Sequence, residues 1–396
     1  MSYTNKLVGG ILLVSGTTIG AGMLALPVCT GLAGFFPSVV LYVLFWIYMT
    51  YTAFLMLEVN LWMENKHTNL VSMAKQTLGR GGEIVSWITY LFLLYSLTTA
   101  YIAGSAPIVI DFIYTLTGYT LPSWAGSVPM LLIFGFFVYR GTQSVDYVNR
   151  LLMFGLAVAY IALAAFLTPH VEVSNLAHAD WNHLWVAVSV VATSFGYHII
   201  IPTLTTYLHR DLSQLKKVIF IGSLVPLIVY IIWELLVLGI VPLSGLEQGL
   251  KGGTDGACLL SDYLQHPILA MIARCFSFFA IVTSFLGVSL SLSDFLADGL
   301  KIKKTHKGRA FLFVLTFLPP IVFTLTNPRA FFSALGYAGA FGVVILLGLL
   351  PALMAWSGRY RKQFTSTFQT PGGKIALIAA MGFSLAVIAL EIASKF

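Results

Sequence analysis

Residues 17–27 read TTIGAGMLALP and lie within an apolar range, 7–29, that is long enough to cross a membrane as a helix. A bilayer core needs about 20 apolar helical residues. Gly20 and Gly22 destabilise a helix interior, and Pro27 removes a backbone donor. The stretch therefore predicts a membrane-spanning helix that unwinds locally.

A second stretch has the same pattern. Residues 193–202 read TSFGYHIIIP, within the apolar range 184–208. Both stretches have a hydroxyl pair, then an apolar residue and Gly, then Pro six or seven positions after that Gly. Because the two ranges lie five spans apart, they cross the membrane in opposite directions. This is the pattern of an inverted repeat.

The composition of the whole chain indicates an integral membrane protein. Of its 396 residues 58% are hydrophobic and 9% are charged, whereas a soluble domain is about 25% charged. Soluble enzymes and nucleic-acid-binding proteins are thereby excluded. The net charge of +7 is expected from membrane orientation alone.

The apolar ranges predict an all-α integral membrane protein with about 11 transmembrane helices. The repeat predicts a first five-helix unit over 1–168, a second, inverted five-helix unit over 184–356, and an additional C-terminal helix over 374–394. The predicted spans are 7–29, 35–58, 84–112, 124–139, 149–168, 184–208, 218–241, 267–297, 310–326, 331–355 and 374–394.

The basic residues predict the orientation. With eleven spans, 18 of the 22 Lys and Arg lie in connections on the side of the N-terminus. Short basic loops stay in the cytoplasm, so we expect the N-terminus inside and the C-terminus in the periplasm. The opposite side has Lys251, Arg329 and Lys395, and Arg274 lies within a span.

Two broken helices have a chemical use. Unwinding exposes N–H and C=O groups at membrane depth, where the N-terminus of a half-helix holds an anion and free carbonyls hold a cation. A zwitterionic amino acid offers both charges. Gly and Pro are also common in membrane helices for packing alone. Two interruptions at matching places in two halves favour transport over that alternative.

Several segments together resemble the bacterial hydroxy and aromatic amino acid permeases, and among them the tyrosine-specific ones, over nearly the whole chain. They are GTTIGAGMLALP at 16–27, TSFGYH at 193–198, VIFIGS at 218–223 with PL at 226–227, and TSFLGV at 283–288 with LAD at 296–298.

The resemblance implies a five-plus-five inverted-repeat, LeuT-like transporter fold of the amino acid, polyamine and organocation (APC) superfamily. It also implies an inner-membrane location and import of tyrosine or a related aromatic amino acid by symport with H⁺. The implied partners are the amino acid, the coupling cation and the lipid bilayer, without a cofactor, a metal or a nucleic acid.

By the same resemblance, backbone groups bind the substrate. N–H groups of the first break would hold its carboxylate, and carbonyls of both breaks would receive its ammonium. Tyr197 and His198, which follow Gly196, would meet its aromatic ring or hydroxyl. The N–H residues are Gly20, Ala21 and Gly22, and the carbonyls lie near Thr17, Thr18, Ile19, Ser194 and Phe195.

The coupling ion has two candidate sites. Proton-coupled relatives often have a lysine in the fifth span, but residues 151–168 contain none. His198 lies in an otherwise uncharged helix interior and titrates near physiological pH, which favours a proton. Thr283 and Ser284 are adjacent hydroxyls that resemble the sodium position of sodium-coupled relatives. Either set also fits a purely structural role.

Other polar residues within spans have two interpretations each. Tyr95 with Thr98 or Thr99 shares one helix face, which either lines an aromatic pocket or packs against a neighbour. Glu234 and Arg274 lie in the outer halves of their spans, and we expect a structural ion pair between them. A proton-relay role for Glu234 is the alternative.

Other function classes lack their motifs. The chain has no H-E-x-x-H, G-x-S-x-G or Walker sequence, so a membrane-embedded enzyme is not indicated. No filter loop or ring of charges indicates a channel. Spacing alone does not separate tyrosine from tryptophan, phenylalanine or small hydroxy amino acids as substrates.

Overall fold

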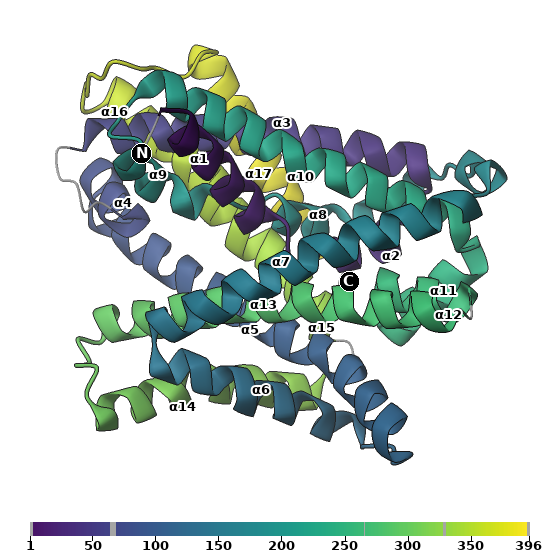
Figure 1. Ribbon diagram of the computed structural model, residues 1–396. Helices are drawn as coiled ribbons and strands as arrows, with labels where there is room; N and C mark the ends of the chain where they lie inside the picture. The colour runs from purple at the N-terminus through teal and green to yellow at the C-terminus, as the bar shows by residue number, and fades with distance from the viewer. Residues whose placement is uncertain (1–2, 64–68, 265, 328–329, 394–396) are drawn as a thin grey trace.

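The computed structural model describes residues 3–63, 69–264, 266–327 and 330–393, and every regular element in these ranges is a helix (Figure 1). Lys66, Arg329 and Lys395 of the basic set, and residue 394 of the last predicted span, lie outside the described residues.

The helices follow the predicted ranges, usually with extra residues at one or both ends. They are α1 (Tyr3–Thr18), α2 (Gly22–Thr30), α3 (Phe35–Trp62), α4 (Leu70–Leu78), α5 (Arg80–Thr117), α6 (Ser123–Arg140), α7 (Thr142–Leu167), η1 (Thr168–His170), η2 (Val173–Ala177), η3 (Trp181–Val186), α8 (Val188–Ser194), η4 (His198–Ile200), α9 (Ile201–Tyr207), α10 (Leu212–Ile240), α11 (Leu243–Gly252), α12 (Gly256–Leu264), α13 (Pro267–Gly299), α14 (His306–Thr326), α15 (Ala330–Tyr337), η5 (Ala338–Leu349), α16 (Leu350–Tyr360) and α17 (Gly373–Ala393).

Within the described ranges, nine helices are long and apolar enough to cross a membrane. The bent pair α1–α2 makes a tenth span. The one remaining predicted range, 124–139, is the shorter apolar helix α6. This pattern is that of a membrane protein with many spans, as the composition predicts.

The helices divide into central and peripheral ones. In an apolar 18-residue stretch of the span from Ala330 to Tyr360, 78% of the residues are buried inside the protein. In the corresponding stretches of α7 and α14 the share is 22%. Peripheral helices expose large apolar side chains such as Phe154 and Ile378. Such a surface is stable in lipid and not in water.

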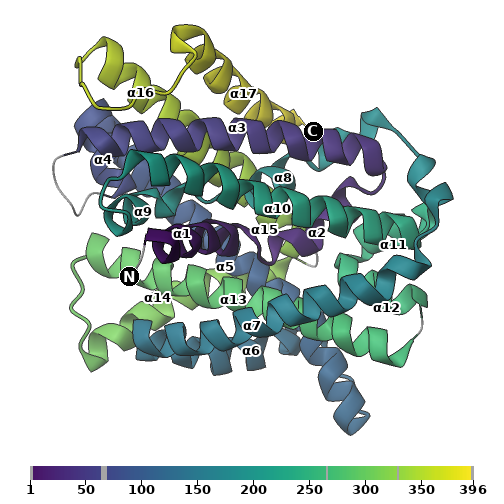
Figure 2. The ribbon, with the colours of Figure 1, turned by 45° about the horizontal axis from the view of Figure 1, so that its top comes forward.

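Figure 2 shows the two ends of the bundle. The N-terminus lies near α9 and the start of α14 at one end, with α4 at that same end, and α11 and α12 lie at the opposite end. The short helices α4, α11 and α12 belong to the connections, and the apolar ranges did not indicate them. The helix α10 packs against α1, α2 and α3 and so links the first broken span to the rest of the bundle.

Close packing explains the glycines of η5, a π-helix that the sequence predicted only as part of one span. A side chain at Gly339 would collide with the backbone carbonyl of Ser189 on α8. One at Gly342 would meet Leu93 of α5 at 2.8 Å. Small residues therefore let η5 lie directly against both helices.

Both predicted helix breaks are present. In the first span α1 ends at Thr18 and α2 begins at Gly22, with a bend of 54° between them. In the sixth span α8 ends at Ser194, and residues 195–197 separate it from η4. Pro27 lies inside α2 and Pro202 near the start of α9, so each break coincides with the glycines and precedes the proline.

Candidate functional site

The two breaks meet at a single side chain, Tyr230 of α10. Its hydroxyl lies 2.7 Å from the carbonyl oxygen of Thr18 and 2.9 Å from that of Ser194. These carbonyls are at the C-terminal ends of α1 and α8, where the helix dipole is negative. Two of the five residues whose carbonyls the resemblance assigns to the substrate ammonium, Thr18 and Ser194, thus meet at one hydroxyl.

The N-terminal end of α2 faces α13. The backbone N–H of Ala21 donates a hydrogen bond of 3.0 Å to Oγ of Ser284. A side chain at Gly20 would collide with that same oxygen, and a Cβ at Gly22 would lie 3.0 Å from Oγ of Ser194. The backbone of the first break is therefore approached closely from both α13 and α8, because its glycines have no side chains.

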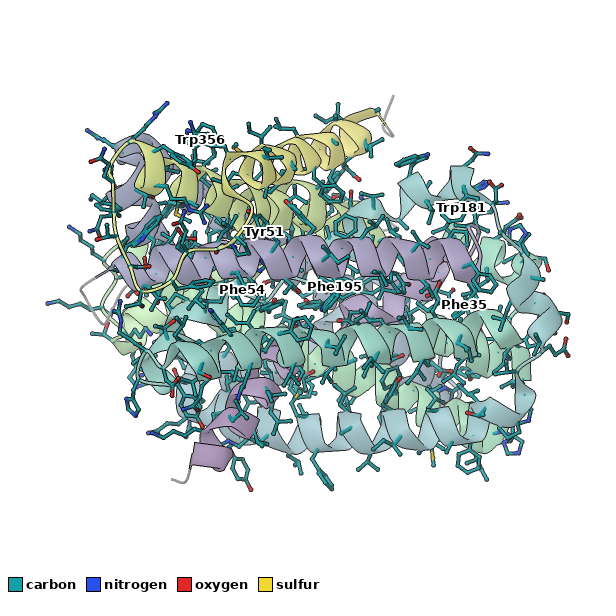
Figure 3. All side chains as sticks on the ribbon, turned by 90° about the horizontal axis from the view of Figure 1, so that it is seen from above. Phe35, Tyr51, Phe54, Trp181, Phe195 and Trp356 are labelled. Carbon is teal, nitrogen blue, oxygen red and sulfur yellow. The ribbon has the colours of Figure 1, made fainter. Side chains whose placement is uncertain are left out.

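Phe195 lies between the two breaks and α3. Its ring contacts the rings of Tyr230 and Tyr42, with centroid distances of 5.3 and 6.4 Å. Figure 3 shows Phe195 near the middle of the length of the bundle, between Trp181 toward one end and Trp356 toward the other. The second break therefore lies at membrane depth and has an aromatic wall.

Two residues of the first break have other surroundings. Thr17 is exposed, and its hydroxyl donates to the carbonyl of Leu13 one turn earlier. Ile19 is half-buried and packs against the hydrophobic core. Of the predicted cation-binding residues in the first span, Thr18 is the one whose carbonyl the structure joins to the second break.

Tyr197 and His198 direct their polar atoms toward α3 and α10. Nε2 of His198 lies 2.8 Å from the hydroxyl of Thr52, and the imidazole is fully buried. The Tyr197 hydroxyl is buried on the side of Thr50 and Ser223 but has no hydrogen-bond partner among the described residues. The Gly196 backbone faces η5 instead, since a Cβ there would lie 3.3 Å from Leu347.

The predicted polar face of α5 packs against a neighbouring helix. The hydroxyl of Tyr95 donates to the carbonyl of Leu315 on α14 at 2.8 Å, and Thr99 donates back to the carbonyl of Tyr95. Tyr101 of α5 lies beside the side chain of Ser284, the residue that binds Ala21 in the first break.

The two hydroxyls of the predicted sodium position diverge. Thr283 donates to the carbonyls of Phe279 and Ala280 on its own helix, and Ser284 reaches Ala21. Among the residues that the structure describes, no three His, Cys, Asp or Glu side chains gather as metal ligands would.

The expected ion pair between Glu234 and Arg274 is wrong. Arg274 pairs with Asp111 of α5 at 2.5 Å. Glu234 instead accepts hydrogen bonds from Thr30 and Tyr42, both at 2.6 Å. The sequence indicates that Glu234 and Arg274 lie at a similar depth in the membrane. It does not indicate how each helix is rotated, and the rotation decides which side chains meet.

Sequence reasoning did not find Tyr230. A signal was present, because Tyr230 lies four residues before Glu234 in a span that is otherwise apolar. Residues four apart lie on one helix face, so the two polar residues mark the face of α10 that points into the protein.

The chain is similar over nearly its whole length to known transport proteins. The sequence profile of the tryptophan/tyrosine permease family matches residues 3–391. Two tyrosine-specific transport systems of Haemophilus influenzae are similar: system 1 is 33% identical, with 99% of this chain and 98% of that protein covered, and system 2 is 30% identical, with 95% and 94% covered. A tryptophan-specific transport protein of Pseudomonas aeruginosa is 32% identical, with 96% and 93% covered.

Proposed function

Because the chain belongs to the tryptophan/tyrosine permease family, a family of transport proteins and not of enzymes, we propose that it imports tyrosine by H⁺ symport across the bacterial inner membrane. The observation that carries the proposal is the junction of the two helix breaks at Tyr230, which gathers backbone carbonyls at membrane depth.

The proposed fold is a five-plus-five inverted repeat of the LeuT type, with units 1–168 and 184–356 and the extra helix at 374–394. Equivalent breaks in the first and sixth spans support it. The proposed orientation has the N-terminus inside and the C-terminus outside. The basic connections beside α4 and α9 support it, since they lie at the same end as the N-terminus (Figure 2).

The charged groups of the substrate would take the place of two side chains, Tyr230 and Ser284, that hydrogen-bond to the backbone of the breaks. Its ammonium would take the carbonyls of Thr18 and Ser194 from the Tyr230 hydroxyl. Its carboxylate would take the N–H of Ala21 from Ser284. In this structure these two side chains satisfy backbone groups that would otherwise be unpaired at membrane depth, where an unpaired polar group is costly.

Tyrosine is proposed over tryptophan on the strength of the sequence resemblance and of the two tyrosine-specific relatives. Tryptophan is the second candidate, because a relative of nearly equal identity is tryptophan-specific. Phe195, Tyr42 and Tyr230 offer aromatic surface for either ring.

The proposed coupling ion is H⁺. Sodium coupling through Thr283 and Ser284 is the alternative, for which Ser284 already lies beside the first break. Labelled tyrosine uptake into proteoliposomes, under an imposed pH gradient or an imposed Na⁺ gradient, separates the two. Competition by unlabelled tryptophan, phenylalanine and serine in the same assay ranks the substrates.

A further inference from the structure

Glu234 is a buried carboxyl group that the substrate site described above does not use. Its side chain is fully buried in the outer half of α10. Oε1 lies 2.6 Å from the hydroxyl of Thr30, the last residue of α2, and Oε2 lies 2.6 Å from the hydroxyl of Tyr42 on α3. The carboxyl group therefore joins three helices.

No basic residue in the described part of the chain forms an ion pair with Glu234. The titratable groups that face it are Cys29 of α2 and Tyr42 of α3, both uncharged at neutral pH. A charged carboxylate in such surroundings is costly, and it becomes much less so when it takes up a proton.

A proton on Glu234 gives each of the shortest contacts around Thr30 its own donor. The single Thr30 proton faces two acceptors, the carbonyl of Leu26 at 2.7 Å and Oε1 of Glu234 at 2.6 Å. If Glu234 is protonated, it donates to Thr30, Thr30 donates to Leu26, and Tyr42 donates to Oε2. All three short contacts are then hydrogen bonds. If Glu234 is charged, Thr30 has to share its single proton between Leu26 and Oε1 of Glu234, and the Thr30 hydroxyl also lies 3.1 Å from the Tyr42 hydroxyl.

The position of Glu234 links a proton to the substrate site. Tyr230, which bridges both breaks, lies one helical turn away on the same face of α10. Thr30 is at the C-terminal end of α2, and the N-terminal end of that same short helix presents Ala21 and Gly22. Losing the proton would therefore change how α2 is held at one end while the substrate is bound at the other.

We propose that Glu234 is the proton-binding residue of the transport cycle, an inference that rests on the proposed H⁺ symport. A proton from the outer side binds the carboxylate, and the same proton leaves to water on the inner side after a conformational change. No other atom or electron is exchanged.

The test compares Glu234→Gln with wild type in proteoliposomes under two conditions. The first is tyrosine counterflow without a pH gradient, and the second is accumulation driven by an inward pH gradient at clamped membrane potential. Glutamine donates to Thr30 and accepts from Tyr42 as the protonated acid does, so counterflow should stay within about twofold of wild type. Accumulation should disappear, whereas one pH unit drives up to about tenfold in wild type with one proton per substrate.

Two controls accompany this variant. Glu391→Gln makes the same change at another buried carboxyl, which binds Ser189 of α8, and should keep proton-driven accumulation. His198→Gln is the second, and it tests the alternative proton site in the second break.

Each other outcome overturns the inference. Accumulation by Glu234→Gln at the wild-type level would show that the proton binds elsewhere, and its loss in His198→Gln would place it there. Loss of counterflow together with accumulation, in a variant that inserts normally, would show a structural role. If wild type itself ignores the pH gradient and requires Na⁺, the proposed H⁺ symport fails, and the inference fails with it.

Discussion

The hydroxyl of Tyr230 lies 2.9 Å from the carbonyl oxygen of Ser194, and it shares its single proton between that carbonyl and the carbonyl of Thr18. One side chain of α10 thus joins the ends of two half-helices that are 176 positions apart, at 18 and 194, in the sequence. Any substrate ammonium that binds these carbonyls has to displace the hydroxyl.

Tyr230→Phe should therefore bind tyrosine more tightly. Without the hydroxyl, the carbonyls of Thr18 and Ser194 have no partner in the empty protein. A hydrogen bond contributes about 0.5–1.5 kcal/mol, so KM for uptake should fall by about 2- to 10-fold. Tyr51→Phe is the control, because that hydroxyl also donates to a backbone carbonyl, of Pro371, and neither residue belongs to a break. A higher KM in Tyr230→Phe alone would contradict the displacement.

Gly22→Val should abolish tyrosine uptake and leave membrane insertion intact. Even a Cβ at this position lies 3.0 Å from Oγ of Ser194, and a branched side chain would block the backbone N–H groups of the first break. Gly20→Val should behave alike, through Ser284. Gly382→Val is the control, since nothing lies within 4 Å of a Cβ there. Normal uptake by a correctly inserted Gly22→Val protein would refute the substrate position.

The orientation can be measured by thiol labelling in a background without Cys29, Cys258 and Cys275. Gly252 and His306 are both exposed, at the end of α11 and at the start of α14. A cysteine at Gly252 should react with a membrane-impermeant reagent added to intact cells, and one at His306 should react only after permeabilisation. The opposite pattern would reverse the proposed orientation.

The buried ion pair between Glu58 and Arg359 should be needed for stability. Arg359 binds both carboxylate oxygens, at 2.8 and 2.5 Å, and the side chains are 1% and 4% exposed. Glu58→Gln leaves a buried guanidinium without its counter-ion, which should cost about 3–5 kcal/mol in the free energy of unfolding. Thermal melting in detergent measures this loss.

The double variant Glu58→Gln with Arg359→Met removes both charges and should recover most of that stability. Its side-chain amide oxygen at position 58 can still accept the backbone N–H of Thr370, as the glutamate does. If the double variant melts at or below the temperature of the single one, the ion pair is not what stabilises this region.

The sequence predicted what depends on local chemistry. The lengths of the apolar ranges predicted the spans. The glycines of TTIGAG predicted the break between Thr18 and Gly22, because glycine weakens a helix whatever its tertiary contacts are. The second break follows from the same pattern around Gly196.

The sequence did not predict what depends on the rotation and distance of whole helices. Arg274 meets Asp111 and not Glu234, and Tyr95 meets Leu315 on α14. The spacing of Tyr230 from Glu234 indicates the inward face of α10, but the partners of Tyr230 come from two other helices, which spacing within one span does not predict.

The proposed coupling of tyrosine uptake to a proton is tested most directly by labelled tyrosine uptake into proteoliposomes at clamped membrane potential. We expect accumulation above the external concentration when the outside is more acidic than the inside, abolition by a proton ionophore, and no requirement for Na⁺. Accumulation that needs a Na⁺ gradient and ignores the ionophore would contradict the account.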